Sequence, residues 1–253
     1  EPQSPMLKKI IVLGLALVAT ATWSLAQIMP SPARAEGDGP YEKLIIRGVT
    51  LIDGTGAPPL GPVDIVVEKN RITQIQAVGY PGVPINENRR PKADDKTKVM
   101  DLTGHYLLPG LIDMHGHIGG SGQGTPAEYV FKLWMAHGIT TVRDPSAGNG
   151  LTWVLDHKKK SAANEITAPR ILAYTSFGQG AKGSITNAEQ AKAWVNENKA
   201  KGADGIKFFG AKPEVMEAAI SENKRIGLKS AMHHQQLDYL MLRMDKYRDL
   251  HPT

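Results

Sequence analysis

From residue 106 onward the chain alternates short apolar segments with amphipathic ones, and this alternation restricts the fold more than any other feature. The apolar segments with the length of strands are 107–114, 139–144, 169–174, 204–209 and 228–233. The helical patterns between them include 126–137, 187–201 and 213–226. Strands that alternate with helices form a parallel sheet with covered faces. We therefore predict an α/β fold, a partial (β/α) TIM-type barrel with about five of the eight strands that closure needs.

The preceding part of the chain, residues 36–105, has a different pattern, in which short strands follow one another through turns. The strand-like segments are 43–47, 49–52, 63–68, 71–75 and 99–102. Lys69-Asn70 fits the tip of a hairpin. Residues 79–97 hold Pro, Gly, Asn and charges without a period, which indicates a surface insertion. We predict a small β-sandwich segment at 36–105, followed by the barrel part at 106–253.

Residues 1–35 contain the pattern of a secretory signal. Lys8-Lys9 precedes the apolar stretch 10–21, and Ala33-Arg34-Ala35 fits a cleavage site. We expect a mature chain that begins near Glu36 and a periplasmic or secreted protein without a stable membrane anchor. An uncleaved anchor is the alternative, although the apolar stretch is shorter than the ~20 residues that a span needs.

Composition narrows the chemistry of any functional site. The 253 residues include no cysteine, which excludes disulfides and thiolate ligands, so a metal would need His, carboxylate or modified Lys ligands. The formal net charge is +5, but no basic stripe interleaved with aromatic residues is present. We therefore expect no nucleic-acid partner. The basic run 158–160 is interpreted as a solvated helix end.

Two histidines follow the first strand of the predicted barrel, within Asp113-Met114-His115-Gly116-His117. Side chains two residues apart on an extended segment point the same way, so both imidazoles are expected on one side. Gly116 is expected to leave the opposite face open. Neutral imidazoles side by side at the end of a buried strand suit a divalent metal. The alternative is a hydrogen-bonded histidine pair under a loop.

Further polar residues occupy the ends of other predicted strands, where parallel barrels carry their active groups. Lys207 lies near the end of the fourth strand, and His233-His234 end the fifth. Lys207 either faces water or is modified or paired, because a free buried ammonium is costly. Asp113 is interpreted as a structural acid, or as one that orients a histidine, rather than as a ligand. Arg143-Asp144 either contacts substrate or forms a salt-bridged loop.

Four segments, taken together and in order, carry a resemblance to a known family: residues 46–56, 101–117, 138–144 and 202–207. They resemble the amidohydrolase superfamily, nearest to its imidazolonepropionase-like and prolidase-like members. The resemblance implies a metal-bearing barrel flanked by a small β-sandwich built from both chain ends. It also implies hydrolysis of amide or related C–N bonds, including peptide and cyclic amide bonds, in a small molecule or short peptide.

The resemblance also implies a set of metal ligands. His115 and His117 would bind one metal, and Lys207, carboxylated by carbon dioxide, would bridge two. The metal would be zinc or another divalent cation, with one or two ions bound. His233 matches the ligand of the second metal best, and His234 is the adjacent alternative. The usual fifth-strand pattern is His-x-His-Gly, whereas this chain has His233-His234-Gln235-Gln236.

Two positions of the family pattern have no counterpart before Thr253, a sixth-strand His and the eighth-strand Asp that acts as general base. No catalytic base is therefore assigned, and the chain is expected to be the N-terminal part of a longer enzyme or a truncated product. The predicted function is a metal-dependent amidohydrolase. The alternative is an inactive fragment or a metal-binding module, whose open sheet edges would favour pairing, including into a homo-oligomer.

Overall fold

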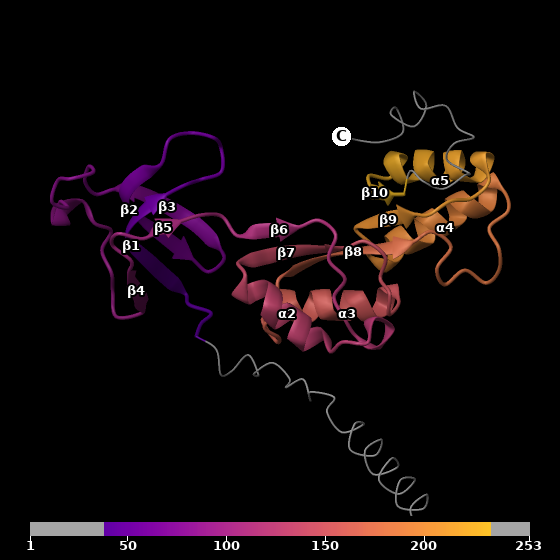
Figure 1. The fold of residues 1–253 in the computed structure, drawn as a ribbon, viewed down its shortest axis with the longest axis horizontal. Helices are drawn as coiled ribbons and strands as arrows, with labels where there is room; N and C mark the ends of the chain where they lie inside the picture. Colours follow the sequence, from indigo (N-terminus) through magenta and orange to yellow (C-terminus); the bar gives the residue numbers. More distant parts are fainter. Residues whose placement is uncertain (1–37, 234–253) are drawn as a thin grey trace, which may run out of the picture. The chain divides into compact units, whose positions relative to one another are not determined.

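The structure is a computed structural model that describes residues 38–233, and two sheets organise this part of the chain (Figure 1). The expected signal at 1–35 and the alternative ligand His234 lie outside the described residues. Between residues 38 and 233, no helix combines the length and the apolar character needed to cross a membrane.

The first sheet has five strands, four of which overlap strands predicted for residues 36–105. They are β1 (Lys43–Leu51), β2 (Leu60–Glu68), β3 (Arg71–Ala77), β4 (Thr97–Asp101) and β5 (Tyr106–Leu107). β1, β2 and β3 pair antiparallel, whereas β4 and β5 run parallel to β1. Val49, Val63 and Ile65 form the core of this sheet. The predicted hairpin with Lys69-Asn70 at its tip joins β2 to β3.

A glycine bends the first strand without ending it. The segments 43–47 and 49–52, expected as two strands, form the single strand β1, with a register shift between Ile46 and Val49. Gly48 has a φ of +73°, and a Cβ at this position would lie 2.2 Å from the Thr103 hydroxyl oxygen. Glycine is therefore required at this bulge by both backbone conformation and close approach.

The predicted surface insertion at 79–97 is fixed to the first sheet by a buried ion pair. It contains a short 3-10 helix, η2 (Glu87–Arg89). The next residue, Arg90, places Nη1 3.3 Å from both carboxylate oxygens of Asp64. The Asp64 side chain is fully buried, the Arg90 side chain is 9% exposed, and the backbone N–H of Gly48 also donates to Asp64. The insertion is thus anchored rather than loose.

The second sheet is parallel throughout and keeps the order of the chain, β6 to β10. Its strands are β6 (Leu111–Asp113), β7 (Ile139–Asp144), β8 (Arg170–Ser176), β9 (Gly205–Phe208) and β10 (Lys229–Met232). The connecting segments carry the 3-10 helix η3 (Ser121–Gln123) and the helices α2 (Ala127–Ala136), α3 (Leu151–Ala162), α4 (Ala188–Lys201) and α5 (Pro213–Arg225). The predicted α/β half-barrel is confirmed.

The core of the second sheet lies between its strands and the helices. α2 and α3 pack against β7 and β8, and α4 and α5 pack against β9. Ile206 and Phe208 are fully buried under the helices. Because strand side chains alternate, Lys207 between them points to the opposite face. α4 begins where the Asn187 side chain accepts from the Gln190 N–H.

The first strand of the predicted barrel, 107–114, is wrong in extent and in burial. Residues 106–107 pair with β1 as β5, and only Leu111–Asp113 joins the parallel sheet. Pro109-Gly110 separates the two segments, because proline lacks an N–H for the ladder. β6 is an edge strand of the described sheet, and Leu111 and Ile112 are each 59% exposed. The strand is therefore not buried as expected.

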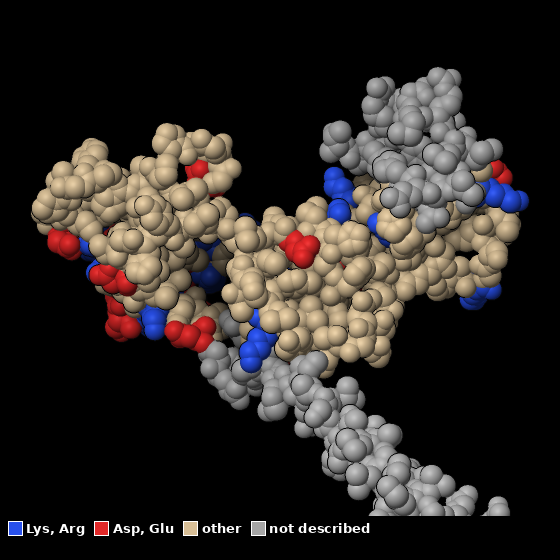
Figure 2. All heavy atoms as spheres, in the orientation of Figure 1, with Lys and Arg blue, Asp and Glu red and all other residues tan. Residues whose placement is uncertain are grey.

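The basic run 158–160 is only partly a solvated helix end. It lies in the last turns of α3, where the helix dipole stabilises positively charged side chains. Lys158 instead pairs with Asp204, with its Nζ 2.7 Å from both carboxylate oxygens. On the face shown in Figure 2, the charged side chains are scattered among uncharged residues.

The carboxylate of Glu222 on α5, which accepts hydrogen bonds from Asn196 of α4 and from Arg225, leads to a pH-dependent prediction. Hydrogen bonds from Arg225 and Asn196 hold the pKa of Glu222 at about 2, below its usual 4.5. Because the pKa is lower in the folded state, this stabilisation is complete above about pH 4.5 and is lost as the pH falls toward 2. We expect Glu222→Gln to lower the free energy of unfolding at pH 7 by on the order of 1 kcal/mol.

Urea unfolding at pH 7 and at pH 3 measures this effect. The difference between the natural protein and Glu222→Gln should shrink at the lower pH. Glu68→Gln, at an exposed position on the first sheet, is the control and should change stability little. A difference that is the same at both pH values would show that the carboxylate charge has no role.

Candidate metal centre

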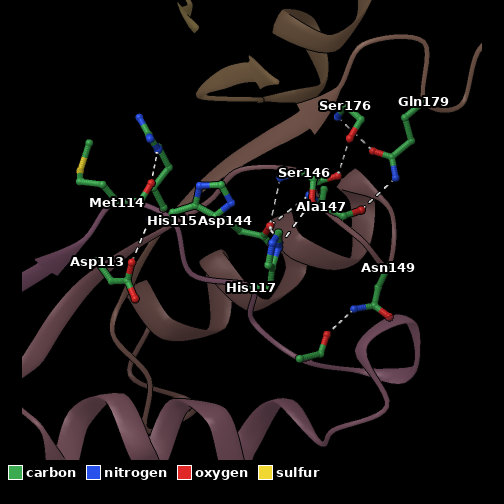
Figure 3. A network of polar contacts seen from close by, with 12 residues as sticks. Asp113, Met114, His115, His117, Asp144, Ser146, Ala147, Asn149, Ser176 and Gln179 are labelled. Carbon is green, nitrogen blue, oxygen red and sulfur yellow. Dashed lines mark hydrogen bonds and ion pairs between the residues drawn. The ribbon is translucent and has the colours of Figure 1, made fainter. Parts of the chain in front are cut away.

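His115 and His117 lie in the loop that follows β6, and their rings are close together (Figure 3). The ring centroids are 5.5 Å apart, with an edge-on angle of 83°. Asp113 accepts a hydrogen bond from the backbone N–H of His115 at 2.9 Å. This acid therefore fixes the backbone of the loop, which is the structural role that the sequence left open beside the orientation of a histidine ring.

Gly116, between the two histidines, does not leave the opposite face open as expected. A Cβ at this position would lie 2.5 Å from Val142 Cγ2 and 2.6 Å from Trp134 Cζ2. The backbone N–H of Gly116 donates to the carbonyl of Arg143 at 3.0 Å. Glycine is needed because the loop lies directly on β7 and α2, and this contact sets the position of both imidazoles.

Arg143 and Asp144, at the end of β7, hold the same loop from the side. Arg143 Nε donates to the carbonyl of Met114 at 2.6 Å, and its guanidinium lies 5.2 Å from the centre of the Tyr174 ring. Asp144 Oδ1 lies 3.5 Å from His117 Nδ1, and the Asp144 side chain is 3% exposed. The sequence left open substrate contact or a salt-bridged loop, and the contacts observed here hold the loop.

Lys207 is buried on β9, at 4% exposure. Among the residues that the structure describes, no carboxylate forms an ion pair with it. Its Nζ lies 5.6 Å from the centre of the Phe209 ring. Burial lowers the pKa of Lys207, and the positive charge of Arg143 lowers it further. The side chain thus faces away from bulk water, so the alternative that Lys207 is solvent-exposed is wrong.

His233 follows β10 directly and is exposed. Its backbone N–H donates to the carbonyl of Phe208 at 3.2 Å, and its ring packs edge-on against Phe209 with centroids 4.9 Å apart. Burial lowers the pKa of His115, and the charges of Lys207, His117, Arg143 and His233 contribute to the same shift. The other three predicted ligands, His117, Lys207 and His233, therefore all contribute to lowering the pKa of His115.

The described donors fall short of a complete ligand set. Within residues 38–233, no group of three His, Asp or Glu side chains is arranged to hold a metal ion. The structure brings His115 and His117 together after β6 and buries Lys207 near the end of β9 in the same sheet. The assignment of these residues and His233 as ligands stays a prediction.

Sequence reasoning missed a network that supports the loops at the strand ends (Figure 3). Asn149 donates to the carbonyl of Gly119 and accepts from the backbone N–H of Gly122 at 2.6 Å. Gln179 Nε2 donates to the carbonyl of Ala147 at 2.9 Å. The one available signal was Asp144-Pro145-Ser146 after a strand, because Asp followed by Pro and Ser is typical of a tight turn.

The chain is similar to several known proteins, although no family model matches it. Adenine deaminase 2 of Rhizobium etli is 35% identical over 132 residues, which cover 49% of this chain and 19% of that protein. A crystal structure of a putative prolidase from Bifidobacterium longum has a TM-score of 0.59 at 24% identity and covers 79% of this chain and 51% of its own. Molinate hydrolase has a TM-score of 0.60 at 19% identity, with 83% and 57% covered.

The chain thus spans about a fifth of the curated relative and little more than half of the two solved structures. The solved structures support the fold, a curled parallel half-barrel with a separate sheet. These similarities, to adenine deaminases in part of the sequence and to a putative prolidase and molinate hydrolase in fold, agree with the resemblance of the sequence to the amidohydrolase superfamily.

Proposed function

We propose that this chain carries part of the centre of a metal-dependent hydrolase that cleaves C–N bonds in a small molecule or short peptide. The observation behind the proposal is the pairing of two adjacent imidazoles with a buried lysine that lacks a carboxylate partner among the described residues. The imidazoles follow the carboxyl end of β6 and Lys207 lies near the carboxyl end of β9 in the same parallel sheet, the edge where barrels place their active groups. Superfamily members generally use divalent metals, and the relatives are hydrolases.

The types of donor atom fit a divalent cation, but the net positive charge of the surrounding side chains does not. Imidazole nitrogens are common ligands of zinc. Lys207 and Arg143, however, both bring positive charge to the site, and an ammonium beside a cation is unfavourable. The charge becomes favourable if the neutral amine of Lys207 adds to carbon dioxide. An N–C bond then forms, one C=O double bond becomes single, a proton leaves the nitrogen, and a carbamate anion results.

Under this proposal His115, His117, carboxylated Lys207 and His233 hold one or two divalent ions, with zinc as the first candidate. When bound, such an ion supplies Lewis-acid polarisation of the substrate and makes water nucleophilic near neutral pH. Arg143 keeps its guanidinium close enough to influence both Lys207 and His115. It therefore favours an anionic group at the position of Lys207.

Asp144 is the described carboxylate beside the histidine pair, but it is poorly placed to act as a general base. It is almost fully buried and accepts hydrogen bonds from the backbone N–H groups of Ser146 and Ala147, both at 3.2 Å. This observation favours a second candidate function, a metal-binding module without hydrolysis. Hydrolysis of purine amine, dipeptide or cyclic amide substrates by the 253-residue chain with zinc would exclude that candidate.

Zinc binding by single-histidine variants tests the proposal. We expect His115→Ala and His117→Ala each to weaken zinc binding by more than about 100-fold, because loss of a direct ligand exceeds the 10–100-fold effect of outer partners. Isothermal titration with zinc alone measures the affinity. His137→Ala is the matched control, since His137 is exposed at the end of α2 and its ring Nδ1 lies 2.7 Å from the Leu133 carbonyl of its own helix. Unchanged zinc affinity in both site variants would defeat the proposal.

A further inference from the structure

The two histidines of the loop after β6 differ in how their rings are held. His117 Nδ1 lies 3.5 Å from Asp144 Oδ1 and 3.4 Å from the hydroxyl oxygen of Ser146 (Figure 3). Among the described residues, the ring of His115 has no hydrogen-bond partner and contacts the ring of His117. The ring of His117 is therefore held through Nδ1, whereas for His115 the described hydrogen bond is that of its backbone N–H.

Asp144 is itself held in a fixed orientation. Its Oδ1 accepts from the backbone N–H groups of Ser146 and Ala147, and its side chain is 3% exposed. The turn that supplies these N–H groups is supported from β8 and the loop after it. The Ser176 hydroxyl donates to the Ser146 carbonyl at 3.2 Å, and Gln179 Nε2 donates to the Ala147 carbonyl. The position of this carboxylate thus depends on two neighbouring strand ends.

The chemistry of the two groups selects one form of the ring. An ionised carboxylate accepts hydrogen bonds and cannot donate them, and a neutral imidazole carries one N–H and one lone pair. The Ser146 hydroxyl can donate or accept and so fits either form of the ring, but a lone pair on Nδ1 would face the Asp144 carboxylate as a second acceptor. A proton on Nδ1 gives a favourable contact and leaves the lone pair on Nε2, at the far side of the ring.

We propose that Asp144 is a positioning residue that keeps His117 in the Nδ1–H tautomer, with the Nε2 lone pair free to bind a divalent cation. The identity of what binds Nε2 rests on the proposed function. The tautomer itself does not, because it follows from contacts made within the chain. Carboxylates that orient metal-binding imidazoles in this way typically contribute 10–100-fold to affinity.

Nitrogen-detected NMR of the metal-free, 253-residue chain tests the tautomer directly. Spectra are recorded above the ordinary imidazole pKa of about 6.5, with the His117 signals assigned by their loss in His117→Ala. We expect the proton on Nδ1 in the natural protein and in Asp144→Asn, because the amide oxygen of Asn still accepts. In Asp144→Ala we expect the Nε2–H form to appear. The His115 signals in the same spectra are the internal control and should keep their tautomer.

Zinc affinity supplies the second measurement. We expect Asp144→Ala to weaken zinc binding by about 10–100-fold and Asp144→Asn to restore most of it. A proton on Nε2 of His117 in the natural protein would overturn the inference, even if Asp144→Ala does not fold. Normal zinc binding with an unchanged tautomer in Asp144→Ala would also overturn it while leaving the metal centre intact. The Nδ1–H form in a protein that binds no zinc would support the inference and reject the proposed function.

Discussion

Lys207→Met is expected to leave the chain folded and to weaken zinc binding by more than about 100-fold, beyond the range for outer partners of a metal. Methionine keeps an unbranched side chain in the buried position and removes both the amine and the charge. The fold should tolerate the change, because the lysine makes no ion pair with any described carboxylate. The loss of affinity follows if a carbamate on Lys207 supplies the negative charge that the two imidazoles lack.

Two further variants sharpen this test. Lys207→Glu restores a carboxylate near the same place and should recover part of the affinity. Lys229→Met, at an exposed position at the start of β10, is the matched control. Carbon NMR of protein equilibrated with ¹³C-labelled bicarbonate should show a carbamate signal that Lys207→Met lacks. Full affinity in Lys207→Met together with no labelled signal in the natural protein would reject a role for lysine carboxylation.

Arg90→Met is expected to lower the free energy of unfolding of the first sheet by about 3–5 kcal/mol, the typical cost of removing one partner of a buried ion pair. Asp64 would keep its hydrogen bond from the Gly48 N–H but lose the Arg90 guanidinium. A fully buried carboxylate without a cation is costly, so Asp64 would take up a proton or the sheet would unfold.

Denaturant unfolding followed by circular dichroism measures this loss. Arg89→Met is the matched control, since the neighbouring arginine is exposed and should change stability little. The double variant Asp64→Leu/Arg90→Met should be more stable than Arg90→Met, because neither charge remains buried. Equal stability of Arg89→Met and Arg90→Met would show that the ion pair does not hold the insertion.

Regular elements were predictable because their sequence patterns are local. The strands near 139–144 and 204–209 and the helix near 187–201 follow from apolar periodicity and from an Asn cap, and the structure confirms them within a few residues. The first barrel strand failed because apolar character alone does not reveal which sheet a segment joins. The Pro109-Gly110 step and the short edge strand after it depend on the pairing of neighbouring strands.

The supporting contacts of the candidate site were not predictable, because they join residues far apart in the sequence. Arg143 and Met114 are separated by 29 positions, and so are Ser146 and His117. The ends of parallel strands could be placed on one rim, which is why the histidine pair and Lys207 were predicted as ligands. The choice of nitrogen on His117, by contrast, depends on a turn after β7 whose orientation only the tertiary structure supplies.

The strand order of the second sheet also bears on how the chain reaches its native state. From β6 to β10 each strand pairs with the one made just before it, so every pairing closes a loop of only one strand and one helix. Since synthesis proceeds from the N-terminus, each nascent strand leaves the ribosome after the strand with which it pairs has emerged. The sheet can therefore grow one unit at a time during translation, without waiting for distant residues.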